Sequence, residues 1–107
     1  MNTDPTLPYY VDLLYTARTR IKRCGVAAIR LGIAREYAAT LRAIIENPSL
    51  TPLNWGDPIR DYKGAKLHLY RRVFGQILTE YAVHEKARIV YIRDCKPVLG
   101  HPLESAS

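Results

Sequence analysis

The chain has 107 residues and a formal net charge of +6, from 16 Lys and Arg against 10 Asp and Glu. This length suits one domain, and the 48% of hydrophobic residues can supply a core, which excludes wholesale disorder. No apolar run is long enough for a transmembrane helix, and the N-terminus lacks the basic flank and apolar core of a secretion signal. We therefore expect a single domain over residues 1–107, cytoplasmic and without membrane contact.

The positive charge is concentrated in two blocks. Residues 18–42 carry seven Arg and Lys against Glu36 alone, and residues 60–96 carry nine against four acidic residues. The chain also has eleven Arg and eight Tyr, side chains that can stack on bases, and Arg also pairs with phosphate. These features favour an anionic partner such as RNA. A solvated helix face, or a groove for an acidic protein, explains the same charge equally well.

The first half of the chain has mainly helical patterns. Residues 9–15 alternate apolar and polar positions as in a strand, although the same residues could begin a helix. Thr16 to Cys24 suits a short helix with a break at Gly25. From Ala34, apolar residues recur every three or four positions, which predicts a helix. This helix should end at Asn47-Pro48, because a residue before proline is driven out of helical geometry.

Residues 47–65 are rich in turn formers, including four prolines or glycines within the stretch 48–58. They predict a long connector with little regular structure. Trp55, in the middle of this connector, should pack onto the core and hold the segment against the body.

The second half changes to a strand pattern. Residues 66–74, 76–84 and 88–95 are β-branched and aromatic runs, and their short connections permit only an antiparallel meander. A first hairpin that turns at Gly75-Gln76 would place Arg71 opposite Glu80 and Leu69 opposite Ala82. A slip of one residue would exchange the two faces, but Arg71 and Arg72 would still lie on opposite sides.

After the last strand, the tail should pack as an extended segment through Val98, Leu99 and Leu103, and then fray from Glu104. The two cysteines, Cys24 and Cys95, lack metal-type spacing. Free thiols are the default expectation, and a disulfide between them stays open. No phosphate loop, nucleophile elbow or zinc-type cluster is present, so we expect neither a metal nor a cofactor.

The order of elements and the strand sequences carry a resemblance to a known family. The residues are Tyr62-Lys63-Gly64-Ala65-Lys66-Leu67-His68-Leu69-Tyr70-Arg71-Arg72, then Ile77–Glu85 and Arg88–Arg93, preceded by a helix that ends in Asn47-Pro48. Over residues 34–96 this pattern resembles the RelE/ParE superfamily, the toxins of bacterial type II toxin–antitoxin modules, which include plasmid-stabilisation systems. The resemblance implies an α+β fold, with N-terminal helices, possibly preceded by a strand, packed on a C-terminal antiparallel β-meander.

The resemblance also implies a function. Superfamily members cleave messenger RNA on the ribosome without a metal, or inhibit DNA gyrase, and a cognate antitoxin protein neutralises them. Ribosome-dependent RNA cleavage is the leading hypothesis. The alternatives are a non-catalytic gyrase-binding toxin and an inactive binding module, because Ile77 or Leu78 stands where RNA-cleaving relatives carry a catalytic arginine. The homo-oligomeric state stays open.

Residue by residue, His68 and Tyr70 fall where the RNA-cleaving relatives carry two lysines, and Arg72 and Lys96 fall at or near basic positions. In this interpretation His68 or Tyr70 is the general acid or base, and Arg72 and Lys96 neutralise the phosphate. The candidate nucleic-acid contacts are Lys63, Lys66, Arg71 and Arg93.

Overall fold

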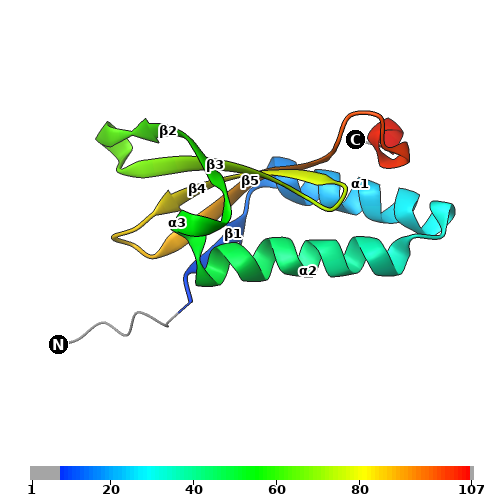
Figure 1. Cartoon of the computed structure of the whole chain (residues 1–107), viewed down its shortest axis with the longest axis horizontal. Coiled ribbons are helices and arrows are strands. Elements are labelled where there is room, and N and C mark those ends of the chain that lie inside the picture. The colour runs from blue at the N-terminus through cyan, green and yellow to red at the C-terminus, as the bar shows by residue number, and fades with distance from the viewer. Residues whose placement is uncertain (1–7, 107) are drawn as a thin grey trace.

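The computed structural model describes residues 8–106 of the chain, and it has an α+β fold (Figure 1). In chain order the elements are β1 (Tyr10–Leu13), α1 (Tyr15–Leu31), α2 (Ala34–Leu50), α3 (Pro52–Trp55), β2 (Asp57–Tyr62), η1 (Lys63–Ala65), β3 (Leu67–Phe74), β4 (Ile77–His84), β5 (Ile89–Pro97) and η2 (Pro102–Ala106), where η denotes a 3-10 helix. The predicted N-terminal helices, C-terminal meander and possible first strand are therefore all confirmed. Residues 1–7, on which the expectation of no secretion signal rests, and Ser107, the last residue of the tail expected to fray, lie outside the described residues.

The strands form one five-stranded sheet in the order β1-β5-β4-β3-β2. β1 pairs parallel to β5, and every other pair is antiparallel. α1 and α2 form an antiparallel hairpin beside the sheet, and α1 packs against β5 (Figure 1). The core lies between the helices and one face of the sheet, and it contains Ala17, Cys24, Ala28, Tyr37, Ile44, Ile77, Tyr81, Val83, Val90, Ile92, Cys95 and Leu103. We call the opposite side of the sheet the open face.

The hairpin between β3 and β4 has the predicted register. Arg71 lies opposite Glu80 and Leu69 lies opposite Ala82, as the turn at Gly75-Gln76 requires. Gly75 has φ +57°, a left-handed conformation that glycine adopts without a steric penalty. The turn therefore fixes which side chains of β3 face the helices.

α1 does not break at Gly25, so that prediction was wrong. The helix continues to Leu31 and ends at Gly32, which has φ +74° and donates its N–H to carbonyls of the preceding turn. A glycine inside a helix costs only about 1 kcal/mol relative to alanine. The packing of α1 on β5 and α2 outweighs this cost.

The predicted end of α2 at Asn47-Pro48 was also wrong, because the helix continues to Leu50 with Pro48 in its last turn. Pro48 is fully buried, so its packing offsets the backbone hydrogen bond that proline cannot donate. The side chain of Asn47 donates to the Ala43 carbonyl at 2.8 Å, and the Thr51 N–H closes the turn on the Asn47 carbonyl.

The segment expected to be an irregular connector contains α3 and the edge strand β2, which pairs with β3. The residues of β2 are exposed, the register of β2 shifts between Pro58 and Arg60, and β2 carries three charged side chains. Proline, charge and irregularity are typical of edge strands, where they block further pairing. In the sequence, the proline and the polar residues of β2 predict turns, which is why the strand was not expected. The expected packing of Trp55 onto the core is confirmed, since only 7% of it is exposed.

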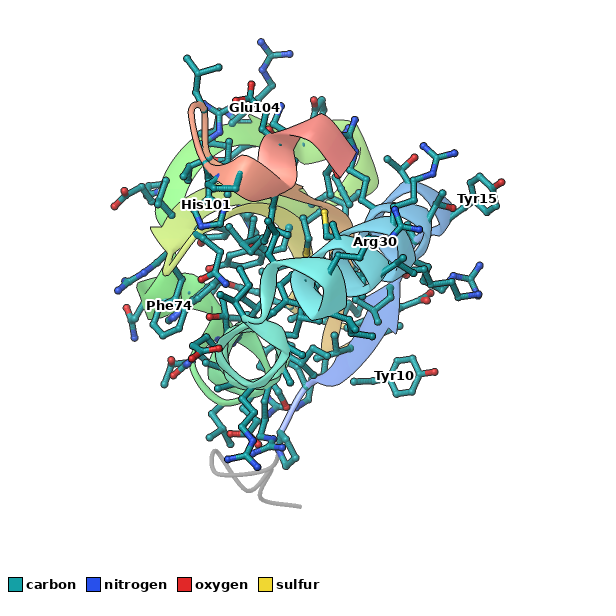
Figure 2. All side chains as sticks on the ribbon, turned by 90° about the vertical axis from the view of Figure 1, so that its right-hand side faces the viewer. Tyr10, Tyr15, Arg30, Phe74, His101 and Glu104 are labelled. Carbon is teal, nitrogen blue, oxygen red and sulfur yellow. The ribbon has the colours of Figure 1, made fainter. Side chains whose placement is uncertain are left out.

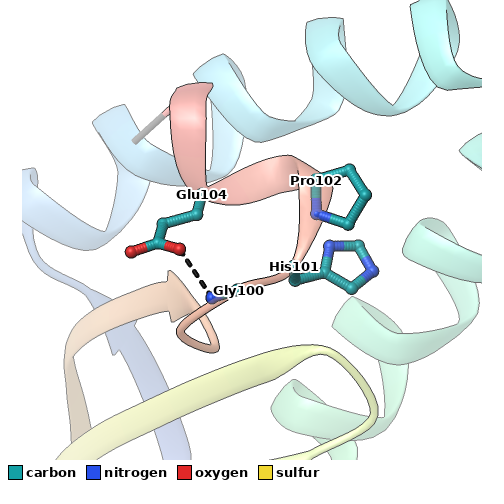
Figure 3. A pocket seen from close by; sticks show the side chains of 4 residues that line it. All are labelled: Gly100, His101, Pro102 and Glu104. Carbon is teal, nitrogen blue, oxygen red and sulfur yellow. Dashed lines mark hydrogen bonds between the residues drawn. The ribbon is translucent and has the colours of Figure 1, made fainter.

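The tail follows the prediction in part. Leu103 is fully buried, but Leu99 is 91% exposed and does not pack as expected. The backbone from Pro102 to Ala106 forms a 3-10 helix instead of an extended, fraying end. The carboxylate of Glu104 accepts a hydrogen bond from the Gly100 N–H at 2.6 Å, which holds the first turn of this helix against the preceding loop (Figure 3).

Candidate functional site

His68 lies on β3 and forms an exposed pair with a carboxylate. Its Nδ1 is 2.8 Å from Oδ1 of Asp61, its cross-strand neighbour on β2. The two side chains are 38% and 58% exposed. When Nδ1 carries the proton and donates a hydrogen bond to the Asp61 carboxylate, Nε2 is unprotonated and can accept a proton. The described part of the chain offers Nε2 no hydrogen-bond partner. This geometry suits a general base that a carboxylate holds in one orientation.

Tyr70, the other candidate acid or base, is buried. Its ring stacks on that of Tyr81, with centroids 5.2 Å apart and planes 11° apart. Burial raises the pKa of Tyr70 above its ordinary value, and the negative charges of Glu85 and Asp61 act in the same direction. The phenol therefore holds its proton more firmly than a free tyrosine does.

Arg72 makes its contacts with the protein itself. Its guanidinium donates to the Trp55 carbonyl at 2.6 Å and lies over the Trp55 ring, 5.3 Å from the centroid. These contacts join β3 to the end of α3, on the helix-facing side to which the hairpin register assigns Arg72. Arg71, on the other side, pairs with Glu80 at 3.2 Å. One arginine lies on each face, as predicted.

Lys96 lies apart from the other three candidate catalytic residues. It is opposite Leu78 on β4, whereas the adjacent pair Cys95 and Thr79 is buried toward the helices. Because successive strand residues point to opposite faces, Lys96 belongs to the open face. The structure thus places His68, Tyr70 and Arg72 along one side of β3 and Lys96 on the other side of the sheet. The catalytic roles given to these four residues stay predictions.

The four candidate nucleic-acid contacts lie in three places. Lys63 begins the 3-10 turn that joins β2 to β3, and Lys66 follows it with φ +55°. Arg71 lies farther along β3 on the open face. Arg93 is the unpaired residue of a β-bulge in β5, since Glu80 pairs with Asp94 while Tyr81 pairs with Ile92. A bulge directs its extra side chain away from the ladder, and Arg93 is exposed.

Carboxylates neutralise part of the charge near Arg93. Asp94 forms an ion pair with Arg20 of α1 at 3.0 Å, and Glu80 pairs with Arg71. The surface around the bulge therefore contains both signs of charge and is not a uniform cationic groove.

Sequence reasoning missed Asp61 and the structural role of Tyr81. Asp61 appeared to lie in an irregular connector, and only its pairing with β3 brings it to His68. The buried Tyr81 hydroxyl donates to the Pro52 carbonyl at 2.7 Å and accepts from the Gly56 N–H at 2.8 Å. It thereby fixes α3 and the entry to β2. The tyrosine in mid-strand was a signal for packing, but nothing in the sequence indicates these partners.

The other polar groups of the described residues include two cysteines and the lining of a surface pocket. Within residues 8–106, no three His, Cys, Asp or Glu side chains gather as metal ligands would. Cys24 and Cys95 are free and buried. The surface pocket near the C-terminus, lined by Gly100, His101, Pro102 and Glu104, is a turn held by its own hydrogen bonds (Figure 3). Among the described helices, none is long and apolar enough to cross a membrane.

Comparison with known proteins identifies the fold. No protein-family model and no curated protein sequence matches the chain. A chain of the toxin–antitoxin complex RelBE2 from Mycobacterium tuberculosis superposes with a TM-score of 0.64 at 21% identity, over 89% of this chain and 97% of that one. A chain of the archaeal RelE–RelB complex from Pyrococcus horikoshii superposes with a TM-score of 0.54, also at 21% identity, over 88% and 99%. The chain therefore has a RelE-like α+β fold, as the sequence resemblance predicted.

Proposed function

We propose that this protein is the toxin component of a type II toxin–antitoxin module and that a cognate antitoxin protein neutralises it. The shared fold supports this proposal, because the match extends over nearly the whole length of chains taken from toxin–antitoxin complexes. The exposed cationic side chains agree with a protein that acts on an anionic target in the cytoplasm.

For the toxic activity, we propose metal-independent cleavage of messenger RNA on the ribosome. The observation that carries this proposal is the contact between His68 and Asp61. Nε2 of His68 would take the proton of a ribose 2′-hydroxyl, whose oxygen attacks the adjacent phosphorus. The bond to the 5′-oxygen breaks, a cyclic phosphate forms, and the leaving oxygen takes a proton from solvent. Lys63 and Lys66, on the turn that precedes His68, are suited to stabilise the phosphate charge.

A second candidate is a toxin that binds its target, such as DNA gyrase, without cleaving RNA, or an inactive binding module with the same fold. The placement of Tyr70, Arg72 and Lys96 favours it. Tyr70 is stacked in the core, Arg72 is engaged by Trp55, and Lys96 lies on the other face. Among the described residues, no hydrogen bond or ion pair joins any of the three to His68.

Induced expression in a bacterial host distinguishes these activities. Growth and the integrity of ribosome-bound messages are followed for the wild type, for His68→Gln and for the control His84→Gln. Glutamine retains hydrogen-bonding groups but cannot act as a base near neutral pH. His84 suits the control because its ring accepts a hydrogen bond from the Ala87 N–H, and no carboxylate within residues 8–106 pairs with it.

RNA cleavage predicts cut messages and growth arrest for the wild type and the control, and loss of both effects for His68→Gln at equal protein levels. Growth arrest with intact messages, unchanged by His68→Gln, would reject cleavage and favour target binding. No arrest by the wild type would reject the toxin assignment.

A further inference from the structure

The outward side of α1 combines exposed apolar and cationic side chains in one stripe. Tyr15, Arg18, Lys22, Val26 and Ile29 follow one another at intervals of three and four residues, so they share one side of the helix. We call this stripe the outer α1 face. The buried residues of the helix, Ala17, Cys24 and Ala28, occupy its other side.

The apolar members of the outer α1 face are unusually accessible. Tyr15 is 75% exposed, Val26 52% and Ile29 70%. The Tyr15 ring projects clear of the ribbon into solvent (Figure 2). Apolar side chains grouped along one helix indicate a contact surface more strongly than scattered ones do.

All charged side chains of the same helix are positive. α1 contains five basic residues and no acidic residue. Arg20 is paired with Asp94. The other four basic side chains make no hydrogen bond or ion pair with any described residue: Arg18, Lys22, Arg23 and Arg30. They are exposed around the apolar members.

From this arrangement we propose that the outer α1 face binds an acidic amphipathic helix of a partner protein. The apolar side chains would pack against its apolar stripe, and the four unpaired cations would face its carboxylates. At 1.5 Å per residue, the face from Tyr15 to Ile29 is about 21 Å long, which suits about four turns of a partner helix. The identity of the partner rests on the proposed function, since the antitoxin is then a natural source of such a helix.

Two other occupants fit the face less well. RNA would pair with the cations, but Val26 and Ile29 offer it neither a stacking ring nor a hydrogen bond. A second copy of the chain would bring a helix with five basic residues against another of the same charge, which is repulsive.

Fluorescence anisotropy with designed probes tests the proposal on the full chain. The first probe is a labelled peptide of about 18 residues, with leucine at three- and four-residue intervals and glutamate between, which covers the length of the face. The second is the same peptide with lysine in place of each glutamate. The third is a labelled single-stranded RNA.

Two double variants remove either component of the face, and each has a matched control. Val26→Ser with Ile29→Ser removes apolar contact, with Ile59→Ser and Leu99→Ser as its control. Arg18→Glu with Lys22→Glu reverses charge, with Arg42→Glu and Lys86→Glu as its control. All eight side chains are exposed, so each variant should fold, and circular dichroism checks this.

The proposal predicts that the acidic peptide binds and that the basic peptide does not. Each face variant should weaken binding of the acidic peptide by about tenfold or more, whereas the controls change it little. Charge reversal should also reduce the salt dependence of binding. Failure of the acidic peptide to bind, equal loss in the controls, or binding of RNA alone through Arg18 and Lys22 would overturn the proposal. Growth arrest by the chain alone does not depend on these outcomes, so the toxin assignment is tested separately.

Discussion

The hydroxyl of Tyr81 holds α3 and the start of β2 in place, and Tyr81→Phe should show how much this contributes. The change leaves a buried carbonyl at Pro52 and a buried N–H at Gly56 without a partner. Each unpaired buried group costs about 1–3 kcal/mol, and the loss of the hydroxyl's own desolvation offsets a little of this. We expect unfolding to become easier by about 2–4 kcal/mol, which lowers the melting temperature of a domain this size by roughly 10–20 °C.

Urea denaturation and thermal unfolding measure this effect, with Tyr91→Phe as the control. The Tyr91 hydroxyl has no hydrogen-bond partner among the described residues, so its removal should shift the melting temperature little. Equal stabilities of Tyr81→Phe and the wild type would refute the reasoning that two backbone groups depend on this one hydroxyl.

The same tyrosine predicts a pH dependence. Burial raises the pKa of Tyr81 to about 12 from an ordinary value of 10.0. The folded chain therefore holds a proton that the unfolded chain releases, so stability is fully present below pH 10 and falls as pH rises toward 12. Across this window, Tyr81→Phe should lose stability less steeply with pH than the wild type. Parallel curves for the two proteins would show that Tyr81 does not titrate as its burial implies.

Three further predictions concern the core and the turns. Burial raises the pKa of both thiols, Cys24 and Cys95, so neither should react with a thiol reagent until the chain unfolds; rapid reaction of the native protein would contradict this. Gly75→Ala should destabilise the fold by more than about 1 kcal/mol in urea denaturation, because φ is +57° and a Cβ would lie 3.0 Å from a threonine hydroxyl of α2; an unchanged midpoint would contradict it. Arg72→Ala should lower the free energy of unfolding by about 1–2 kcal/mol, because the contacts with Trp55 are lost. If this variant loses toxicity without any change in melting temperature, Arg72 acts on a target instead.

The strands of the second half could be predicted because their signals are local and agree with one another. The β-branched runs, the short connections and Gly75 specify the meander, and the register of Arg71 with Glu80 follows from the turn length. The placement of Arg71 and Arg72 on opposite sides follows from strand alternation in any register, and it is confirmed.

The elements that were misjudged depend on contacts distant in sequence. Pro48 and Gly25 are helix breakers by local propensity, but burial of Pro48 and the packing of α1 outweigh that propensity. β2 contains turn-forming residues and becomes a strand because β3 offers it an edge. Asp61 was missed for the same reason, since its distance from His68 is set by strand pairing.

The candidate site was predictable only as residue types along β3. The sequence indicated His68, Tyr70 and Arg72 on one side of a strand, and the structure confirms that placement. The sequence could not show that Tyr81 stacks on Tyr70 or that Trp55 contacts Arg72. Nor could it show that Lys96 lies on the other face of the sheet. Those facts depend on how the helices and β2 pack, and they are the reason why the proposed cleavage rests on His68 and Asp61.

The most direct test of the central claim is bacterial growth after induction of this chain alone. The account predicts that the chain alone arrests growth and that co-expression of its cognate antitoxin restores growth. Normal growth on induction of the folded chain alone would contradict the assignment as a toxin.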